Sequence, residues 1–390
     1  MTVWDELVGQ ADIIASLRVS VAAANAALRG EQTSGMTHAW LFTGPPGSGR
    51  SNAARAFAAA LLCEQGGCGS CLSCRTALVG SHADVTHVDT DQAQLKVDPI
   101  RELVRKAALA PAGRRWHVII VEDADRLNDR AADALLKSIE EPPPRTVWML
   151  CAPTAEDVAP TIRSRCRLLV LRTPPTASVA AYLMEREQVP AAVASFAARA
   201  SQGHIGRARA LALDEATRNR RRDVLRVPAQ LKDLGSCLTC AANLMDAASE
   251  EARPRAEALD ARELADLETA YGAGTVGIRS TGFAAASKDL QKNQKQRAKR
   301  LVRDVVDRSL LDLASYYRDV VAVQLGSHTE LVNEEMRPDI ITTARGTTAE
   351  ISTRGLAEIF ATREALEGEI SPLLALESLM ISLRGLSTGR

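Results

Sequence analysis

The chain has 390 residues, more than one hydrophobic core usually serves, so two or three domains are expected. Its 48 basic residues balance 48 acidic ones, which excludes a protein that coats nucleic acid or an anionic membrane through bulk charge. Aromatic residues are only 3% of the total, which argues against stacking platforms for single strands. We find no export signal and no window approaching the roughly 18 apolar residues of a membrane helix, so we expect a cytoplasmic protein without membrane contact.

Up to residue 172, short apolar runs alternate with helical patterns, which is typical of a parallel sheet covered by helices. The segments that predict strands are 39–43, 117–121, 147–152 and 168–171. Those that predict helices are 51–63, 100–110 and 129–140, and the last ends against three prolines. We therefore expect an α/β domain over residues 1–172.

Two further domains are expected after the pair Pro174 and Pro175. Residues 173–215 predict a small helical block that Gly203 and Gly206 break. Residues 216–390 show no strand pattern and predict an all-helical domain, with an interruption rich in Gly and Ser at 271–281.

A glycine-rich loop lies between the first predicted strand and the helix that follows it. It reads GPPGSGRS and comprises Gly44, Pro45, Pro46, Gly47, Ser48, Gly49, Arg50 and Ser51. In a strand–loop–helix context this pattern predicts that backbone N–H groups bind the phosphates of ATP or ADP, with Ser51 reaching Mg²⁺. Arg50 stands where lysine is usual, so we expect nucleotide binding but weak or absent hydrolysis.

The strand at 117–121 is followed by Glu122 and Asp123. Carboxylates at that position orient Mg²⁺ and activate the attacking water in nucleotide hydrolases. The order here is Glu-Asp instead of the more usual Asp-Glu, which also favours slow turnover. A solvated acidic loop is the alternative.

Four of the eight cysteines fall within a dozen residues, at Cys63, Cys68, Cys71 and Cys74. Four thiolates can close a tetrahedral site, so the residues 63–74 predict a structural Zn²⁺ module. An iron–sulfur cluster and buried free thiols are the alternatives, and His82 and His87 are not needed as ligands. The role of Cys237 and Cys240 stays open.

Five strings together resemble the clamp-loader subunits of bacterial DNA polymerase III, which belong to the AAA+ superfamily, and most of all the delta-prime type. These strings are WDELVGQ, GPPGSGRS, the four-cysteine insert, VEDADRLNDRAADALLKSIEEPPPRT and APTIRSRC. The resemblance implies an AAA+ P-loop domain with an inserted zinc module, then a helical lid and an all-α collar for oligomerisation.

The resemblance also implies roles for single residues. Trp4, Val8 and Gly9 would lie near the adenine base, and Arg207 would sense the nucleotide from the lid. Arg165 would act as an arginine finger, completing the ATP site of a neighbouring subunit in trans. Thr154 is an offset candidate for the polar sensor residue, because Ala152 and Pro153 occupy its expected place.

The sequence differs from the motif residues of an active ATPase at three places, namely Arg50, the pair Glu122-Asp123 and the sensor position. These differences favour a delta-prime stator over a gamma/tau motor. As part of the polymerase III holoenzyme, such a subunit would sit with gamma/tau and delta in a hetero-pentameric ring. The ring loads the sliding clamp onto primed DNA. A motor subunit, another AAA+ remodelling ATPase and a nucleotide-free scaffold are the alternatives.

Two stretches are strongly basic, residues 218–222 and residues 288–303. Each could contact DNA, and a solvated helix face is an equally good interpretation. We expect the second stretch to lie in the collar and to serve assembly.

Overall fold

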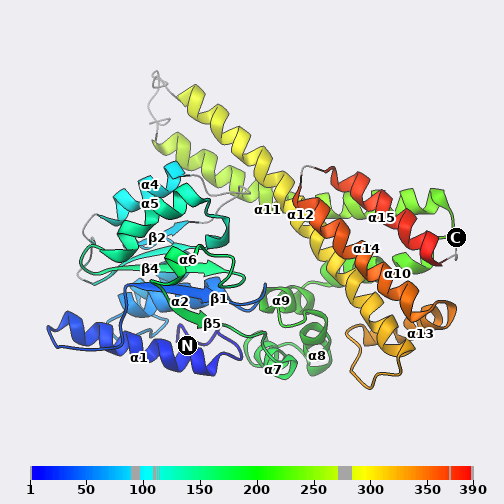
Figure 1. Cartoon of the computed structure of the whole chain (residues 1–390), viewed down its shortest axis with the longest axis horizontal. Helices are drawn as coiled ribbons and strands as arrows, with labels where there is room; N and C mark the ends of the chain where they lie inside the picture. The colour runs from blue at the N-terminus through cyan, green and yellow to red at the C-terminus, as the bar shows by residue number, and fades with distance from the viewer. Residues whose placement is uncertain are drawn as a thin grey trace. The chain divides into compact units, whose positions relative to one another are not determined.

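The structure is a computed structural model that describes residues 2–88, 97–108, 111, 113, 115–270, 283–368 and 370–387 (Figure 1). The chain forms two compact units, Met1–Leu213 and Asp214–Arg390. The predicted interruption at 271–281 lies outside the described residues.

The first unit combines a parallel sheet with helices. Its strands are β1 (Ala39–Thr43), β2 (Val85–Val88), β3 (His117–Val121), β4 (Thr146–Ala152) and β5 (Arg167–Val170). The helices before and within the sheet region are α1 (Ala11–Leu28), α2 (Arg50–Leu62), α3 (Leu72–Val79), α4 (Val97–Ala107), η1 (Ala124–Arg126), α5 (Asp129–Glu140) and α6 (Pro160–Arg163). Three helices follow: α7 (Thr176–Arg186), α8 (Ala191–Ala200) and α9 (Ile205–Leu213).

All pairings in the sheet are parallel, and the strand order is β2-β3-β4-β1-β5. Successive side chains of each strand point to opposite faces, so every central strand contributes to two cores. Trp40 and Phe42 of β1 pack toward α1, α2 and α3, whereas Leu41 packs toward α4 and α5. Figure 1 shows α1 on one side of the sheet and α4 and α5 on the other. The predicted α/β fold is confirmed.

Most predicted elements of this unit are present within one or two residues of their expected bounds, although β2 was not expected. β2 is short, and only Val85 in it is buried, so it lacks the apolar run that predicts the other strands. Gly206 does not break a helix, because it lies in the first turn of α9. Gly203, with φ of +88°, makes the turn before that helix.

The helices α7, α8 and α9 have a hydrophobic core of their own, built around Val179, Leu183, Ala197 and Leu211. A separate lid domain at 173–215 stays a prediction, as does the boundary at 172. The contact pattern joins these helices to the first unit and divides the chain after Leu213.

The second unit is helical throughout its described part. Its elements are α10 (Glu215–Gln230), α11 (Leu234–Ala270), α12 (Phe283–Gln324), η2 (Glu334–Met336), α13 (Arg337–Gly346), α14 (Ala349–Glu367) and α15 (Pro372–Ser387). Arg221, from the first basic stretch, is only 4% exposed and donates to Asp312 at 2.9 Å and to Glu335 at 2.6 Å. This arginine is therefore part of the interior of the second unit and not of a solvated face.

One helix, α1, is long and apolar enough to pass a membrane-span test, with 18 residues and a mean hydropathy of 1.4. We expected no such window, so that prediction is wrong for α1. The core helices of soluble proteins pass the same test, and Leu17, Val21 and Ala24 of α1 belong to the core on one face of the sheet.

Candidate nucleotide site and metal centre

The glycine-rich loop joins the carboxyl end of β1 to the first turn of α2, which begins at Arg50 as expected. Gly44, Gly47 and Gly49 all have positive φ, a backbone conformation that other residues rarely adopt. A Cβ at Gly44 would lie 2.6 Å from the carbonyl oxygen of Leu171, so this glycine also permits a close approach of two backbone segments. The loop thus presents its N–H groups at the amino end of a helix, where phosphate groups bind.

Two residues that the sequence did not single out contact this loop. The Gln10 side chain donates to the carbonyl oxygens of Ser48 at 3.4 Å and Arg172 at 2.6 Å. The imidazole of His204, just before α9, lies against Gly47, since a Cβ there would be 2.5 Å from His204 Cγ. The loop is therefore contacted by the chain's amino-terminal segment and by the turn before α9.

Two side-chain atoms at the loop are buried, and neither has a hydrogen-bond partner among the described residues. They are the hydroxyl oxygen of Ser48 and Nη1 of Arg50. A buried guanidinium nitrogen without a partner is costly, and phosphate oxygens are acceptors that would satisfy it. These atoms fit a bound nucleotide, which would supply the phosphates held here.

Glu122 lies just past the end of β3 and is held by side chains from two other elements. Oε1 of Glu122 accepts a hydrogen bond from Arg55 of α2 at 2.7 Å and lies 2.6 Å from Nε2 of His87 of β2. Burial alone would raise the pKa of Glu122, but hydrogen bonds from His87 and Ser51 and the charge of Arg55 bring it below its usual value. The carboxylate is thus engaged within the chain and stays ionised.

The neighbouring acidic residues have a different environment. Asp123 lies 4.0 Å from the guanidinium of Arg126. Burial and the charge of Asp123 raise the pKa of Asp125, and the charges of Arg126 and Arg50 partly oppose this. Arg50 thus lies close enough to the acidic end of β3 to influence its electrostatics.

Glu122→Gln is expected to lower the free energy of unfolding by about 1–3 kcal/mol at pH 7, because the variant loses a charge-assisted hydrogen bond in a mostly buried place. The folded pKa of Glu122 is lowered, so its stabilisation is present above the unfolded value near 4.5 and is lost as the pH falls through the folded value. Urea unfolding of the nucleotide-free chain across this range measures both effects. Glu102→Gln, at an exposed position on α4, should leave stability unchanged.

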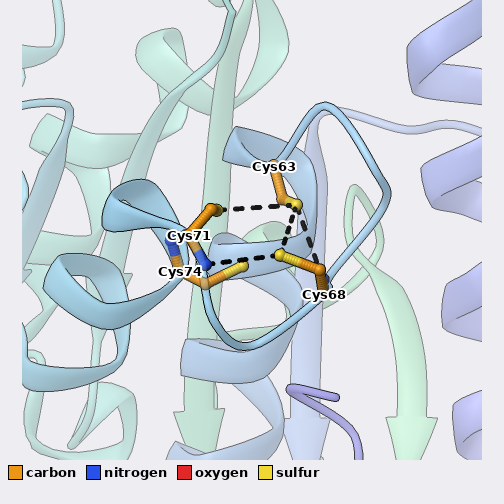
Figure 2. A group of neighbouring side chains, drawn as sticks. All are labelled: Cys63, Cys68, Cys71 and Cys74. Carbon is orange, nitrogen blue, oxygen red and sulfur yellow. Dashed lines mark hydrogen bonds between the residues drawn. The ribbon is translucent and has the colours of Figure 1, made fainter. Parts of the chain in front are cut away.

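The four cysteines of the insert converge, and their sulfur atoms lie within 4.8 Å of one another (Figure 2). Sγ of Cys63 is 3.7 Å from that of Cys68 and 3.8 Å from that of Cys71. A tetrahedron with Zn–S bonds of about 2.3 Å has edges of about 3.8 Å. The spacing therefore fits a four-thiolate zinc site.

Backbone N–H groups point at these sulfurs, as they do where thiolates are stabilised. The N–H groups of Cys68, Cys71 and Cys74 donate to the sulfurs of Cys63, Cys68 and Cys71 at 3.4–3.5 Å. The bond from the Cys71 N–H, with help from Ser70, lowers the pKa of Cys68 to about 6. The glycines Gly66, Gly67 and Gly69 adopt positive φ in this loop, as its tight turns require.

The metal loop also touches the amino-terminal segment. The carbonyl of Gly67 accepts a hydrogen bond from the N–H of Val3 at 3.1 Å, and a Cβ at Gly67 would lie 3.3 Å from Nε1 of Trp4. Trp4 is 4% exposed and packs in the core beside this loop. Val8 instead packs with the lid helices, and Gly9 has φ of +71° beside Pro175. The adenine-binding role of Trp4, Val8 and Gly9 stays a prediction.

The remaining candidates lie at three separate places in the first unit. Arg165 follows α6 and is 39% exposed; its guanidinium donates to Glu140 at 2.6 Å and to the carbonyl of Thr161 at 2.7 Å. The exposed Thr154 donates to Asp157 at 2.8 Å. Arg207 of α9 is half-buried, and its backbone N–H donates to Nδ1 of His204. Arg207 therefore lies one helical turn after the histidine that contacts Gly47. Their proposed roles stay predictions.

The family match lies in the first unit. Residues 23–175 match the family model described as DNA polymerase III, delta subunit. The gamma/tau subunit of DNA polymerase III from Mycobacterium tuberculosis H37Rv is 35% identical over 183 residues, which is 46% of this chain and 30% of that protein. The delta-prime subunit from Pseudomonas aeruginosa PAO1 is 39% identical over 136 residues, or 33% and 41% of the two chains.

A solved DNA polymerase III gamma subunit-related protein from Thermotoga maritima aligns over 94% of this chain and 99% of its own, with 13% identity and a TM-score of 0.45. The chain spans less than half the length of the curated relatives named above. Residues 23–175 are thus similar to the DNA polymerase III delta-subunit family, and the curated relatives are gamma/tau and delta-prime subunits of the same polymerase.

Proposed function

We propose that the chain acts as a delta-prime-type stator in a DNA polymerase III clamp loader. Together with gamma/tau and delta subunits in a five-membered ring, it would support ATP-dependent loading of the sliding clamp onto primed DNA. It would bind ATP or ADP with Mg²⁺, hydrolyse it slowly or not at all, and carry Zn²⁺ in a structural role.

The observation that supports this proposal is the set of contacts that the Glu122 carboxylate makes within the chain. In an active ATPase the carboxylates after this strand face Mg²⁺ and the attacking water. Here Glu122 is bound to Arg55 and His87, and its pKa is lowered by these contacts and by Ser51, the residue expected to reach Mg²⁺. Binding Mg²⁺ in the productive way would require these contacts to break.

A gamma/tau-type motor is the second candidate, because gamma/tau subunits are among the relatives with the greatest similarity. The two candidates differ in what the chain does alone. A stator retains nucleotide without turnover, whereas a motor hydrolyses ATP with its own loop and acidic residues.

Steady-state ATP turnover by the purified chain is therefore expected to be at least about 100-fold slower per site than turnover by the reconstituted ring with primed DNA and clamp. Equilibrium binding of labelled ADP to the same sample should be saturable, and Arg50→Ala should lower the affinity for ADP. Robust turnover by the chain alone, abolished by Arg50→Ala, would favour the motor. No binding at millimolar nucleotide would favour a nucleotide-free scaffold.

A further inference from the structure

A two-helix arm extends beyond the core of the second unit. That core reaches Ala252 on α11 and Leu301 on α12, and residues 253–270 and 283–300 continue past it side by side (Figure 1). We use the word arm for these two segments. At 1.5 Å per residue, each is about 27 Å long.

The two helices of the arm have opposite charge. Residues 253–270 carry five acidic and three basic side chains, whereas residues 283–300 carry six basic and one acidic. Arg297 is 9% exposed and forms ion pairs with Asp260 and Glu263. Hydrogen bonds from Arg297 lower the pKa of Glu263, so this carboxylate stays ionised in its pair with the guanidinium. Arg297 therefore marks the side of α12 that faces α11.

Four lysines occupy the opposite side of α12. Lys288, Lys292, Lys295 and Lys299 follow one another at spacings of four, three and four residues, so they form one stripe along the helix. At about 100° per residue, the stripe lies roughly 180° from Arg297 around the helix. All four lysines are exposed, and none has an ion-pair partner within the part of the chain that the structure describes.

The composition of this stripe distinguishes between classes of partner. Protein interfaces are poor in lysine and are built around apolar and aromatic side chains, and no large apolar residue of 283–300 is among the exposed ones of the described structure. Single strands need aromatic side chains for base stacking, and the stripe has none. A row of four cations over about 16 Å, roughly one every 5 Å, instead suits duplex DNA, which presents about one phosphate charge per 1.7 Å of its axis and so offers each lysine a phosphate.

We propose that the lysine stripe of α12 binds the phosphate backbone of double-stranded DNA without reading its sequence. The proposed function already involves primed DNA, and this inference adds a surface of the chain itself that contacts the duplex, outside residues 23–175 and independent of nucleotide and of a neighbouring subunit. The chain's net charge of zero does not oppose it, because the four lysines form a local cluster of cations on an exposed helix face.

The test uses the full chain and a fluorescent duplex, with anisotropy recorded at several salt concentrations. Replacing all four lysines by alanine, the strongest helix former, should weaken binding at least about tenfold and reduce the slope of log K against log salt by up to about 3.6. The four Lys→Arg substitutions should preserve both quantities. Circular dichroism verifies that the helices are retained.

The matched control removes Arg253, Arg255 and Arg262, three exposed arginines on the acidic helix of the same arm. Changing them to alanine should alter affinity and salt slope much less than the lysine substitutions do. Equal binding by the wild type and the lysine variant, or an equal loss in the control, would overturn the proposal. Tighter binding to a single strand than to the duplex, or equally strong competition by polyglutamate, would overturn the assignment to duplex DNA.

Discussion

Cys74→Ser is expected to reduce the zinc content of the purified chain from about one ion to less than about 0.1, and to destabilise the first unit by several kcal/mol. Cys74 is fully buried and is one of four sulfurs within 4.8 Å of one another, so three thiolates would remain around an incomplete site. The loss is bounded by the roughly 10–16 kcal/mol with which zinc-finger peptides bind the ion. Elemental analysis and urea unfolding measure the two effects.

The control for this experiment is Cys240→Ala. Cys240 is buried in the second unit, outside the four-cysteine group, so its loss should leave zinc content unchanged. A Cys74→Ser protein that keeps one zinc ion per chain would contradict the assignment. Iron, with visible absorption from a cluster, would instead support the iron–sulfur alternative.

Arg165→Ala is expected to slow hydrolysis at one neighbouring ATP site of the assembled ring by about 10³-fold or more, the magnitude typical of arginine fingers. The side chain is 39% exposed and held by Glu140 at its own surface, so the variant should fold and assemble normally. A neighbour's phosphates would compete with Glu140 for the guanidinium. Clamp loading and ATP turnover by the reconstituted ring, at matched subunit ratios, measure the effect.

Two further variants separate this role from a general loss of charge. Arg163→Ala removes a guanidinium that donates to the carbonyl of Ala155 within the chain, and it should leave turnover unchanged. Arg165→Lys keeps the positive charge but loses the planar fork, so it should remain defective. Normal turnover and loading by the Arg165→Ala ring would show that this arginine completes no neighbour's site.

The convergence of the four cysteines and the turn of the glycine-rich loop could be predicted because each depends on a short stretch of chain. Four cysteines in a dozen residues can converge with little help from the rest of the fold, and the positions of Gly44, Gly47 and Gly49 follow from the local turn. The central strands could be predicted equally well, because a strand that is buried on both faces requires an uninterrupted apolar run.

The tertiary contacts of Glu122 and of the glycine-rich loop could not be predicted in this way. Glu122 meets His87 only because β2 pairs with β3, and β2 has too few apolar residues to be recognised as a strand. His204 reaches Gly47 across more than 150 residues of chain, and no periodic pattern marks it. The pairing of an acidic and a basic helix in the arm likewise depends on tertiary structure, although both charge patterns are visible in the sequence.

The hydrogen bonds of Gln10 restrict the segment that joins β5 to α7. Gln10 accepts from the N–H of Arg172 at 3.3 Å and donates to the carbonyl of the same residue at 2.6 Å, so Arg172 is tied to the chain's first segment. That segment is anchored in turn at Val3 by the metal loop. Thr173, Pro174 and Pro175 are the residues between this tied position and the start of α7 at Thr176. Because the two prolines fix their own φ angles, a rotation of the lid predicted at 173–215 that kept these bonds would have few dihedral angles available in this segment.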